Sequence, residues 1–147
     1  MIAEGAPAPD FEAPDQDGRP FRLSGLRGSP VVLYFYPEAD TPGCTRESQA
    51  FQALLPEFAR RGVKVVGVSV DDCPKQKAFA QKYGLRFPLV ADSKKAVVAL
   101  FGVQNPRGAA RRVSFFLDPA GTVVEVVDTS KAETHVERAR ARFLASS

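Results

Sequence analysis

The sequence predicts an α/β protein with a mixed central sheet, helices on both of its faces and an N-terminal β-hairpin. Two runs of β-branched and aromatic residues, Val31–Phe35 and Val63–Val70, are typical of strands buried on both faces. A helical pattern follows each run, which favours parallel strands joined by crossovers. A late pair of strand patterns around a short turn indicates an antiparallel hairpin. The length of 147 residues fits one domain over 1–147.

The chain is expected to open with a hairpin and continue into a buried strand. Residues 15–18, Asp-Gln-Asp-Gly, form a turn signal between short apolar pieces around Phe11 and Phe21. The strand Val31–Phe35 has no polar alternation, and Pro37 ends it. The residues that follow Phe35 are therefore expected at the carboxyl edge of the sheet.

A helix is predicted to begin directly after Thr41. Thr41 suits the N-cap, and Pro42 suits the first helical position, where a missing N–H costs nothing. This places Cys44 at the third helical residue. Pro56 is expected to kink or interrupt the helix, and Gly62 to end it. One face carries apolar residues at helical spacing, namely Phe51, Leu54, Leu55 and Phe58.

The remaining patterns continue the alternation of strands and helices. They predict a strand over Val63–Val70, a helix opened by Asp71, Asp72 and Pro74 and stopped by Gly84, a strand over Phe87–Val90, a helix capped by Asp92 or Ser93 and running through Leu100, strands over Arg112–Leu117 and Thr122–Val127, and a helix over Lys131–Leu144. This order of elements matches a thioredoxin-like fold.

Composition and charge exclude several function classes. The net charge is +3, but the basic residues are dispersed among acidic ones, which favours a solvated surface over nucleic-acid binding. The longest apolar run, Val31–Tyr36, is far short of the roughly 20 residues of a membrane span. Without a secretory signal, a cytoplasmic protein with reduced thiols is expected. One histidine and two cysteines exclude a multi-His metal site, a zinc cluster and a disulfide scaffold.

Cys44 is the candidate nucleophile, because it lies in the first turn of a helix beyond the carboxyl end of a strand. The thiolate is the reactive form, and a free cysteine has a pKa of about 8.5. A helix N-terminus stabilises an anion by about 0.3–1 kcal/mol, less than one pKa unit. A fixed cation is therefore also needed, and arginine suits the role better than His135, which nothing in the sequence connects to this site. The alternative, an inert buried cysteine, is disfavoured by the polar and turn-forming neighbours of Cys44.

The segment Pro37–Cys44, with the sequence PEADTPGC, resembles the P-x-x-x-T/S-x-x-C active-site motif of the peroxiredoxins. The surrounding residues resemble the bacterioferritin comigratory protein (PrxQ) subfamily in particular. Similar segments extend over nearly the whole chain, at Ala8–Phe11, Asp15–Gly18, Tyr34–Pro37, Gly67–Ser69, Phe87–Leu89 and Ser114–Asp118.

The resemblance implies a thiol peroxidase that reduces hydrogen peroxide and organic hydroperoxides without metal, haem or flavin. Cys44 would attack a peroxide oxygen and become a sulfenic acid, Thr41 would hydrogen-bond the peroxide and the thiolate, and Pro37 would shield the pocket from water. The pattern Arg-x-Ser-Phe assigns the arginine of the family to Arg112. Its neighbour Arg111 is expected to point to the opposite face of the strand.

The sequence leaves open how the sulfenic acid would be reduced. The resolving cysteines common in the subfamily fall at positions that are Gln49 and Ala80 in this chain. Cys73 is the remaining internal candidate, at a helix start on the same sheet edge as Cys44. A disulfide needs Cα atoms within about 4.4–6.8 Å, so local unfolding near Cys44 would be required. The alternative is a one-cysteine enzyme that an external thiol reduces directly.

Thioredoxin or a similar thiol reductant is the implied partner, and the resemblance implies a monomer or weak dimer. A thiol–disulfide oxidoreductase is disfavoured, because Thr41 stands where a C-x-x-C motif needs its first cysteine. The remaining alternative is a peroxide redox sensor or chaperone-like module using the same cysteine. Rapid turnover with a reductant favours the enzyme, whereas a stable complex of the oxidised protein favours the sensor.

Overall fold

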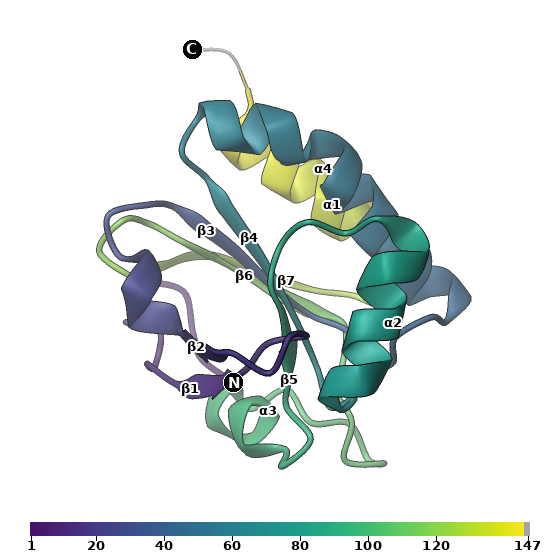
Figure 1. Cartoon of the computed structure of the whole chain (residues 1–147). Helices are drawn as coiled ribbons and strands as arrows, with labels where there is room; N and C mark the ends of the chain where they lie inside the picture. The colour runs from purple at the N-terminus through teal and green to yellow at the C-terminus, as the bar shows by residue number, and fades with distance from the viewer. Residues whose placement is uncertain (146–147) are drawn as a thin grey trace.

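The computed structural model describes residues 1–145, which form a five-stranded sheet, a two-stranded hairpin and four α-helices (Figure 1). In chain order the elements are β1 (Glu12–Pro14), β2 (Pro20–Arg22), the 3-10 helix η1 (Leu23–Leu26), β3 (Val31–Phe35), α1 (Pro42–Arg60), β4 (Lys64–Ser69), α2 (Cys73–Tyr83), β5 (Leu89–Ala91), α3 (Ala96–Phe101), β6 (Val113–Leu117), β7 (Val123–Asp128) and α4 (Ala132–Phe143). The last two residues of the predicted domain over 1–147 lie outside this description.

The five-stranded sheet is mixed and has the order β5-β4-β3-β6-β7. Strands β3, β4 and β5 are parallel, while β6 is antiparallel to both β3 and β7. Helices α1 and α2 supply the crossovers that parallel strands need. The predicted mixed sheet and N-terminal hairpin are thus confirmed. Because Phe35 pairs with Val113, the chain leaving β3 and the chain entering β6 meet at one sheet edge.

Both faces of the sheet are buried, and the side chains of β3 alternate between them. Val31, Leu33 and Phe35 belong to one hydrophobic cluster, and Val32 and Tyr34 belong to the other. The hairpin, η1 and α3 cover the first face, whereas α1, α2 and α4 cover the second, with α1 and α4 side by side (Figure 1). Burial on both sides explains why the strand sequences lack polar alternation.

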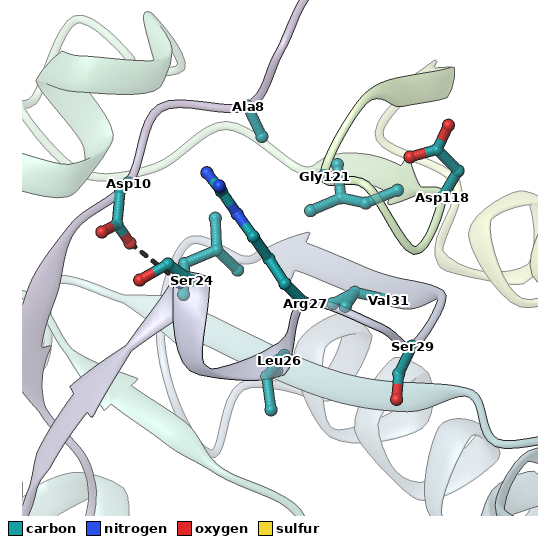
Figure 2. A pocket seen from close by; sticks show the side chains of 11 residues that line it. Ala8, Asp10, Ser24, Leu26, Arg27, Ser29, Val31, Asp118 and Gly121 are labelled. Carbon is teal, nitrogen blue, oxygen red and sulfur yellow. Dashed lines mark hydrogen bonds between the residues drawn. The ribbon is translucent and has the colours of Figure 1, made fainter.

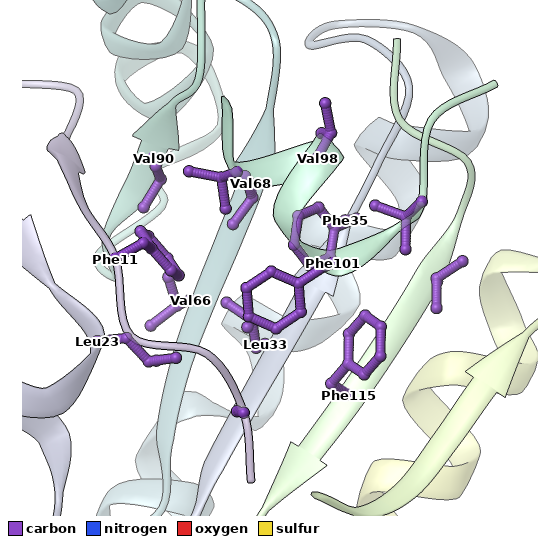
Figure 3. Close-up of a cluster of buried hydrophobic side chains, with 14 of the residues drawn as sticks. Phe11, Leu23, Leu33, Phe35, Val66, Val68, Val90, Val98, Phe101 and Phe115 are labelled. Atoms are coloured by element: carbon purple, nitrogen blue, oxygen red, sulfur yellow. The ribbon is translucent and has the colours of Figure 1, made fainter. Parts of the chain in front are cut away.

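Aromatic packing holds the short helix α3 on the sheet. Figure 3 shows Phe101 of α3 beside Phe35 and Phe115, with ring centroids 5.3 and 5.2 Å away. All three rings are fully buried. Burying one such side chain contributes about 1.5–3 kcal/mol. A helix of six residues is too short to be stable by itself, so this packing keeps it folded.

Of the two outcomes predicted at Pro56, a kink or an interruption, the interruption is wrong, because α1 continues through Pro56 to Arg60. A proline inside a helix costs about 3 kcal/mol. Phe51 and Phe58 lie on either side of Pro56, and both are fully buried. Their burial contributes about 1.5–3 kcal/mol each and offsets the cost. Gly62 follows the helix end with a φ of +70°, which agrees with its predicted role.

Two element boundaries differ from the prediction around residue 90. Strand β5 begins at Leu89 rather than Phe87, since Pro88 has no N–H to offer the sheet. Helix α3 begins at Ala96, later than expected. The Asp92 side chain nevertheless accepts hydrogen bonds from the backbone N–H groups of Val97 and Val98. The N-cap position itself is held by Lys95, so the prediction of Asp92 or Ser93 as the cap is wrong, although Asp92 bonds to the first turn of the helix.

Candidate active site

Cys44 lies in the first turn of α1, with Thr41 as the N-cap and Pro42 as the first helical residue, as predicted. It is a free thiol with an exposed fraction of 1%. Its side chain borders a pocket of about 510 Å³ at the edge where β3 and β4 end and β6 begins. The pocket is lined by Pro37, Glu38, Thr41, Cys44, Val70, Asp71, Arg107, Ala109 and Arg112.

A second pocket, shown in Figure 2, is a poor candidate for the site. It lies at the opposite end of β3 and β6, where Val31 pairs with Leu117. Its volume is about 20 Å³, room for about one water molecule. Its lining includes Asp10, Ser24 and Arg27 but no thiol. The chemistry predicted for this chain therefore belongs to the Cys44 pocket.

Arg112, the arginine that the sequence resemblance pointed to, lies beside Cys44. It directly precedes β6, and its Nη2 donates to Cys44 Sγ at 3.4 Å. Its Nη1 donates to Glu47 Oε1 at 2.6 Å, and its Nε donates to the carbonyl of Ser130 at 3.1 Å. Three bonds thus fix the guanidinium against the thiol. A Cβ at Gly43 would stand 3.0 Å from Nη2, so the close approach depends on a glycine at that position.

Arg111 points away from the site, as expected of neighbouring residues at a strand start. It forms an ion pair with Asp128 at 2.6 Å on the surface. Arg107, from the segment between α3 and β6, is an exposed side chain that lines the Cys44 pocket. Sequence reasoning missed Arg107, because nothing in a loop pattern indicates which side chains reach a pocket.

Thr41 and Pro37 both line the pocket beside Cys44. The Thr41 hydroxyl donates to the carbonyl of Glu38 at 2.7 Å. Since its single proton is used there, the oxygen can act only as an acceptor towards a group in the pocket. Pro37 is half-buried and carries no backbone N–H.

The segment between β3 and α1 is fastened to α2 and its preceding loop. The backbone N–H of Ala39 donates to the buried Asp71 carboxylate at 2.7 Å. Lys75 of α2 pairs with both Asp71 and Glu38, at 3.1 and 2.8 Å. Asp40, which has a φ of +61°, accepts hydrogen bonds from Lys82 and Tyr83 at the far end of α2. These contacts hold one wall of the pocket in place.

Cys73 is the first residue of α2 and a half-buried free thiol. It follows β4, so it lies on the same sheet edge as Cys44, as predicted. Asp71, two residues earlier, lines the Cys44 pocket, whereas Cys73 is not among the lining residues. The predicted role of Cys73 as a resolving cysteine stays a prediction.

Glu47 and His135 complete the site beneath Arg112, and sequence reasoning missed both. The expectation that nothing links His135 to this site is wrong: its Nδ1 lies 3.8 Å from Glu47 Oε2. Both side chains are fully buried. His135 Nε2 contacts the carbonyl of Thr129 at 2.8 Å, and its Nδ1 contacts Ser114 Oγ at 2.7 Å. The spacing of Glu47, three residues after Cys44 on a helix, was a usable signal.

The pKa values of Glu47 and His135 both differ from the ordinary values of these side chains. Burial raises the pKa of Glu47 to about 8, against the opposing effect of the Arg112 charge. Burial also lowers the pKa of His135. Glu47 Oε2 has no hydrogen-bond partner, which agrees with a carboxyl group removed from water.

This titration predicts a pH-dependent stability. With Cys44 reduced, folded Glu47 keeps its proton up to about pH 8, whereas the unfolded chain loses it near the ordinary value of 4.5. Between these values the folded state binds more protons, so the free energy of unfolding falls as the pH rises, by at most about 1.4 kcal/mol per pH unit. The stabilisation that protonated Glu47 gives to the folded state is fully present below pH 4.5 and is lost as the pH rises through about 8.

Urea unfolding across that pH range checks the prediction. Glu47→Gln should flatten the slope relative to the wild type. Glu125→Gln is the matched control, because arginines of α4 hold the pKa of Glu125 below its ordinary value despite partial burial. A slope unchanged by Glu47→Gln would show that Glu47 ionises normally in the folded chain.

Within the described residues, no group of three or more His, Cys, Asp or Glu side chains is placed to hold a metal ion. No helix in residues 1–145 has the length and apolar character needed to cross a membrane.

Fold and site together define the class of protein. Thr41 occupies the position where a C-x-x-C motif needs its first cysteine, so this site lacks the dithiol motif of the thiol–disulfide oxidoreductases. A single thiol held by an arginine at a helix start is suited to attack a peroxide, and the class is that of the thiol peroxidases. The chain belongs to the AhpC/TSA family, which matches residues 5–126.

Known proteins similar to this chain are peroxiredoxins of the Q and bcp types. The chloroplastic peroxiredoxin Q of Sedum lineare is 38% identical over 139 residues, which is 92% of this chain and 75% of that protein. The chain spans 64% of the wheat (Triticum aestivum) peroxiredoxin Q. The crystal structure of peroxidoxin BcpB from Mycobacterium tuberculosis is 38% identical, with a TM-score of 0.91 over 99% of this chain and 100% of that one. The bacterioferritin comigratory protein of Xanthomonas campestris, studied for alkyl peroxide reduction, is 34% identical, with a TM-score of 0.85 over 91% of this chain and 90% of that one.

These likenesses confirm the resemblance stated from the sequence, the thioredoxin-like fold and the thiol peroxidase activity. They do not favour the alternative of a sensor or chaperone-like module. Members of the family act on peroxides with thiol reductants.

Proposed function

We propose that Cys44 is the nucleophile of this peroxidase and that Arg112 is the cation that stabilises its thiolate. The contact of Arg112 Nη2 with Cys44 Sγ at 3.4 Å, beside an open pocket, carries the proposal. The sulfur attacks the terminal oxygen of a hydroperoxide, so that an S–O bond forms while the O–O bond breaks. Sulfur gives up two electrons and the peroxide takes them. The leaving alkoxide or hydroxide takes one proton and departs as alcohol or water.

Thr41 and Pro37 assist this reaction in different ways. The Thr41 oxygen, whose own proton is bound to the carbonyl of Glu38, accepts a hydrogen bond from the peroxide O–H. Pro37 presents an apolar ring without a donor, which keeps water away from the sulfur. The substrates are hydrogen peroxide and small organic hydroperoxides. The alkyl peroxide reduction studied in the Xanthomonas relative supports the second class.

Chemical trapping tests the assignment of the nucleophile. The reduced chain is treated with one equivalent of hydrogen peroxide in the presence of dimedone, which captures sulfenic acids. Peptide mass spectrometry should find the adduct on Cys44. An adduct confined to Cys73 would overturn the assignment.

The reductant is proposed to be thioredoxin or a similar thiol of the cytoplasm, where thiols are kept reduced. The protein is proposed to act as a monomer or weak dimer. The resemblance to the PrxQ subfamily supports both points. Peroxide consumption driven by thioredoxin, compared with consumption driven by a small thiol, tests the first. Sedimentation over a range of protein concentrations tests the second.

Oxidation is expected to join Cys44 and Cys73 in a disulfide after local unfolding of the first turn of α1. The common position of the two cysteines at one sheet edge supports this. Treatment with equimolar peroxide, followed by non-reducing peptide mass spectrometry, should reveal the linked peptides in the wild type and none in Cys73→Ser. A wild type without the linked peptides would establish a one-cysteine enzyme that an external thiol reduces directly.

A further inference from the structure

One cation, the Arg112 guanidinium, contacts two acidic side chains near the N-terminus of α1, Cys44 and Glu47. The Arg112 guanidinium donates to Cys44 Sγ at 3.4 Å and to Glu47 Oε1 at 2.6 Å. The Glu47 side chain has no exposed surface, and its Oε2 has no hydrogen-bond partner. If Cys44 and Glu47 were both ionised, two buried anions would share one positive charge.

Among residues 1–145, Arg112 is the one cation that acts on the Glu47 carboxyl group strongly enough to shift its titration. The titratable and charged side chains around Glu47 are Cys44 and Arg46 on α1, Arg112 before β6, and Glu133, His135 and Glu137 on α4. Arg46 is exposed and pairs with Glu133 at 3.5 Å. Glu133 and Glu137 add negative charge to the same side. A buried charge without a partner is strongly destabilising.

His135 does not supply the missing charge. Its Nε2 must donate to the carbonyl of Thr129, because a carbonyl only accepts. Its Nδ1 is then free to accept from the Ser114 hydroxyl in the neutral ring. Burial disfavours the charged ring as well. Within the described part of the chain, the neutral imidazole therefore leaves Arg112 as the one cation in contact with Glu47.

We infer that Cys44 and Glu47 share one proton, which the Glu47 carboxyl group holds while Cys44 is a thiolate and releases once Cys44 has become a sulfenic acid. The inference rests on the proposed role of Cys44 as the nucleophile. Glu47 is then a positioning residue that acts through Arg112. In its neutral form it leaves the guanidinium charge to the thiolate, and in its ionised form it keeps Arg112 in place after oxidation.

The proton balance of the reaction closes under this arrangement. Before attack, Arg112 is balanced by the thiolate and Glu47 is neutral. Attack forms the S–O bond, breaks the O–O bond and leaves an uncharged sulfenic acid, while the departing alkoxide takes one proton. Glu47 then ionises and releases one proton to solvent. Glu47 does not line the Cys44 pocket, but it lines a neighbouring pocket of about 180 Å³ between α1 and α4, and its proton leaves to solvent there.

Infrared difference spectroscopy of the full chain, reduced against oxidised by one equivalent of hydrogen peroxide near neutral pH, tests the inference. Oxidation should remove the carbonyl stretch of a protonated carboxyl group and add a carboxylate band. Glu47→Gln should abolish both signals. Glu125→Gln should keep them, since it alters another largely buried glutamate, one paired with Arg138 and Arg142. If Glu47→Gln does not fold, wild type carrying ¹³C-carboxyl glutamate should show the lost band at a shifted frequency.

The outcomes separate this inference from the proposed function. If the Cys44 thiol is consumed and no protonated carboxyl signal is lost, the shared proton is refuted while the nucleophile stands. If the thiol of Cys44 is not consumed, the proposed nucleophile itself is refuted. Proton uptake from a weak buffer gives a second readout: Glu47→Gln should take up one more proton per oxidised Cys44 than the wild type. Equal uptake would also contradict the inference.

Discussion

Replacing Cys44 by serine is expected to abolish peroxide turnover, down to the rate at which the reductant and the peroxide react alone. A serine hydroxyl stays protonated, is a far weaker nucleophile than a thiolate and cannot be oxidised to a sulfenic acid. The side chain is almost fully buried, and serine has nearly the same shape, so the fold should persist. Peroxide consumption with excess thiol reductant measures the effect.

Cys73→Ser is the matched control for this experiment, because it removes the other thiol of the chain at a half-buried position. The first oxidation by peroxide should proceed in this variant at the wild-type rate. Circular dichroism should show the same secondary structure in both variants. Peroxide turnover that survived in Cys44→Ser would transfer the role of nucleophile to another group.

Replacing Arg112 by alanine is expected to lower the second-order rate constant of peroxide attack by roughly 10²–10³-fold, the usual loss when one charge-stabilising donor is removed from an active site. The change removes the donor to Cys44 Sγ at 3.4 Å and, among residues 1–145, the only ion-pair partner of Glu47 Oε1. Stopped-flow measurement of thiol oxidation, made on a single turnover, separates this step from later reduction.

Two variants sharpen the Arg112 experiment. Arg111→Ala removes a neighbouring arginine that pairs with Asp128 on the surface, and it should react at the wild-type rate. Arg112→Lys keeps a positive charge but loses the planar guanidinium group that contacts Cys44 and Glu47 at once. Its rate constant for peroxide attack should therefore lie between those of the wild type and Arg112→Ala. A wild-type rate in Arg112→Ala would mean that another group supplies the cation.

The parts of the site that sequence rules predicted are those fixed by neighbours in the chain. Thr41 and Pro42 set the start of α1, and the helix start sets the position of Cys44. The requirement for a cation also followed from the size of the helix-terminus effect. Its identity did not, because Arg112 and Cys44 are 68 residues apart and meet only through the pairing of β3 with β6. A resemblance to a known motif supplied that assignment.

The residues that sequence reasoning missed depend on packing between distant elements. His135 reaches Glu47 only because α4 lies along α1 across one face of the sheet. The sequence predicted a helix over Lys131–Leu144 but not which element it would pack against. Pro56 shows the same limit in the fold, since a local rule for helix ends was overridden by the burial of Phe51 and Phe58.

The hydrogen bond from the Ala39 amide to Asp71 makes it possible to measure how often one wall of the Cys44 pocket opens. That amide is buried, and its acceptor is a buried carboxylate in the loop before α2. An amide held in this way exchanges with deuterated solvent only when the surrounding segment opens. Its exchange rate therefore reports how often the wall between β3 and α1 detaches from α2, in the resting protein and without any peroxide. Comparing this opening rate with the rate of disulfide formation shows whether opening of the segment or the chemical reaction limits formation of the Cys44–Cys73 disulfide.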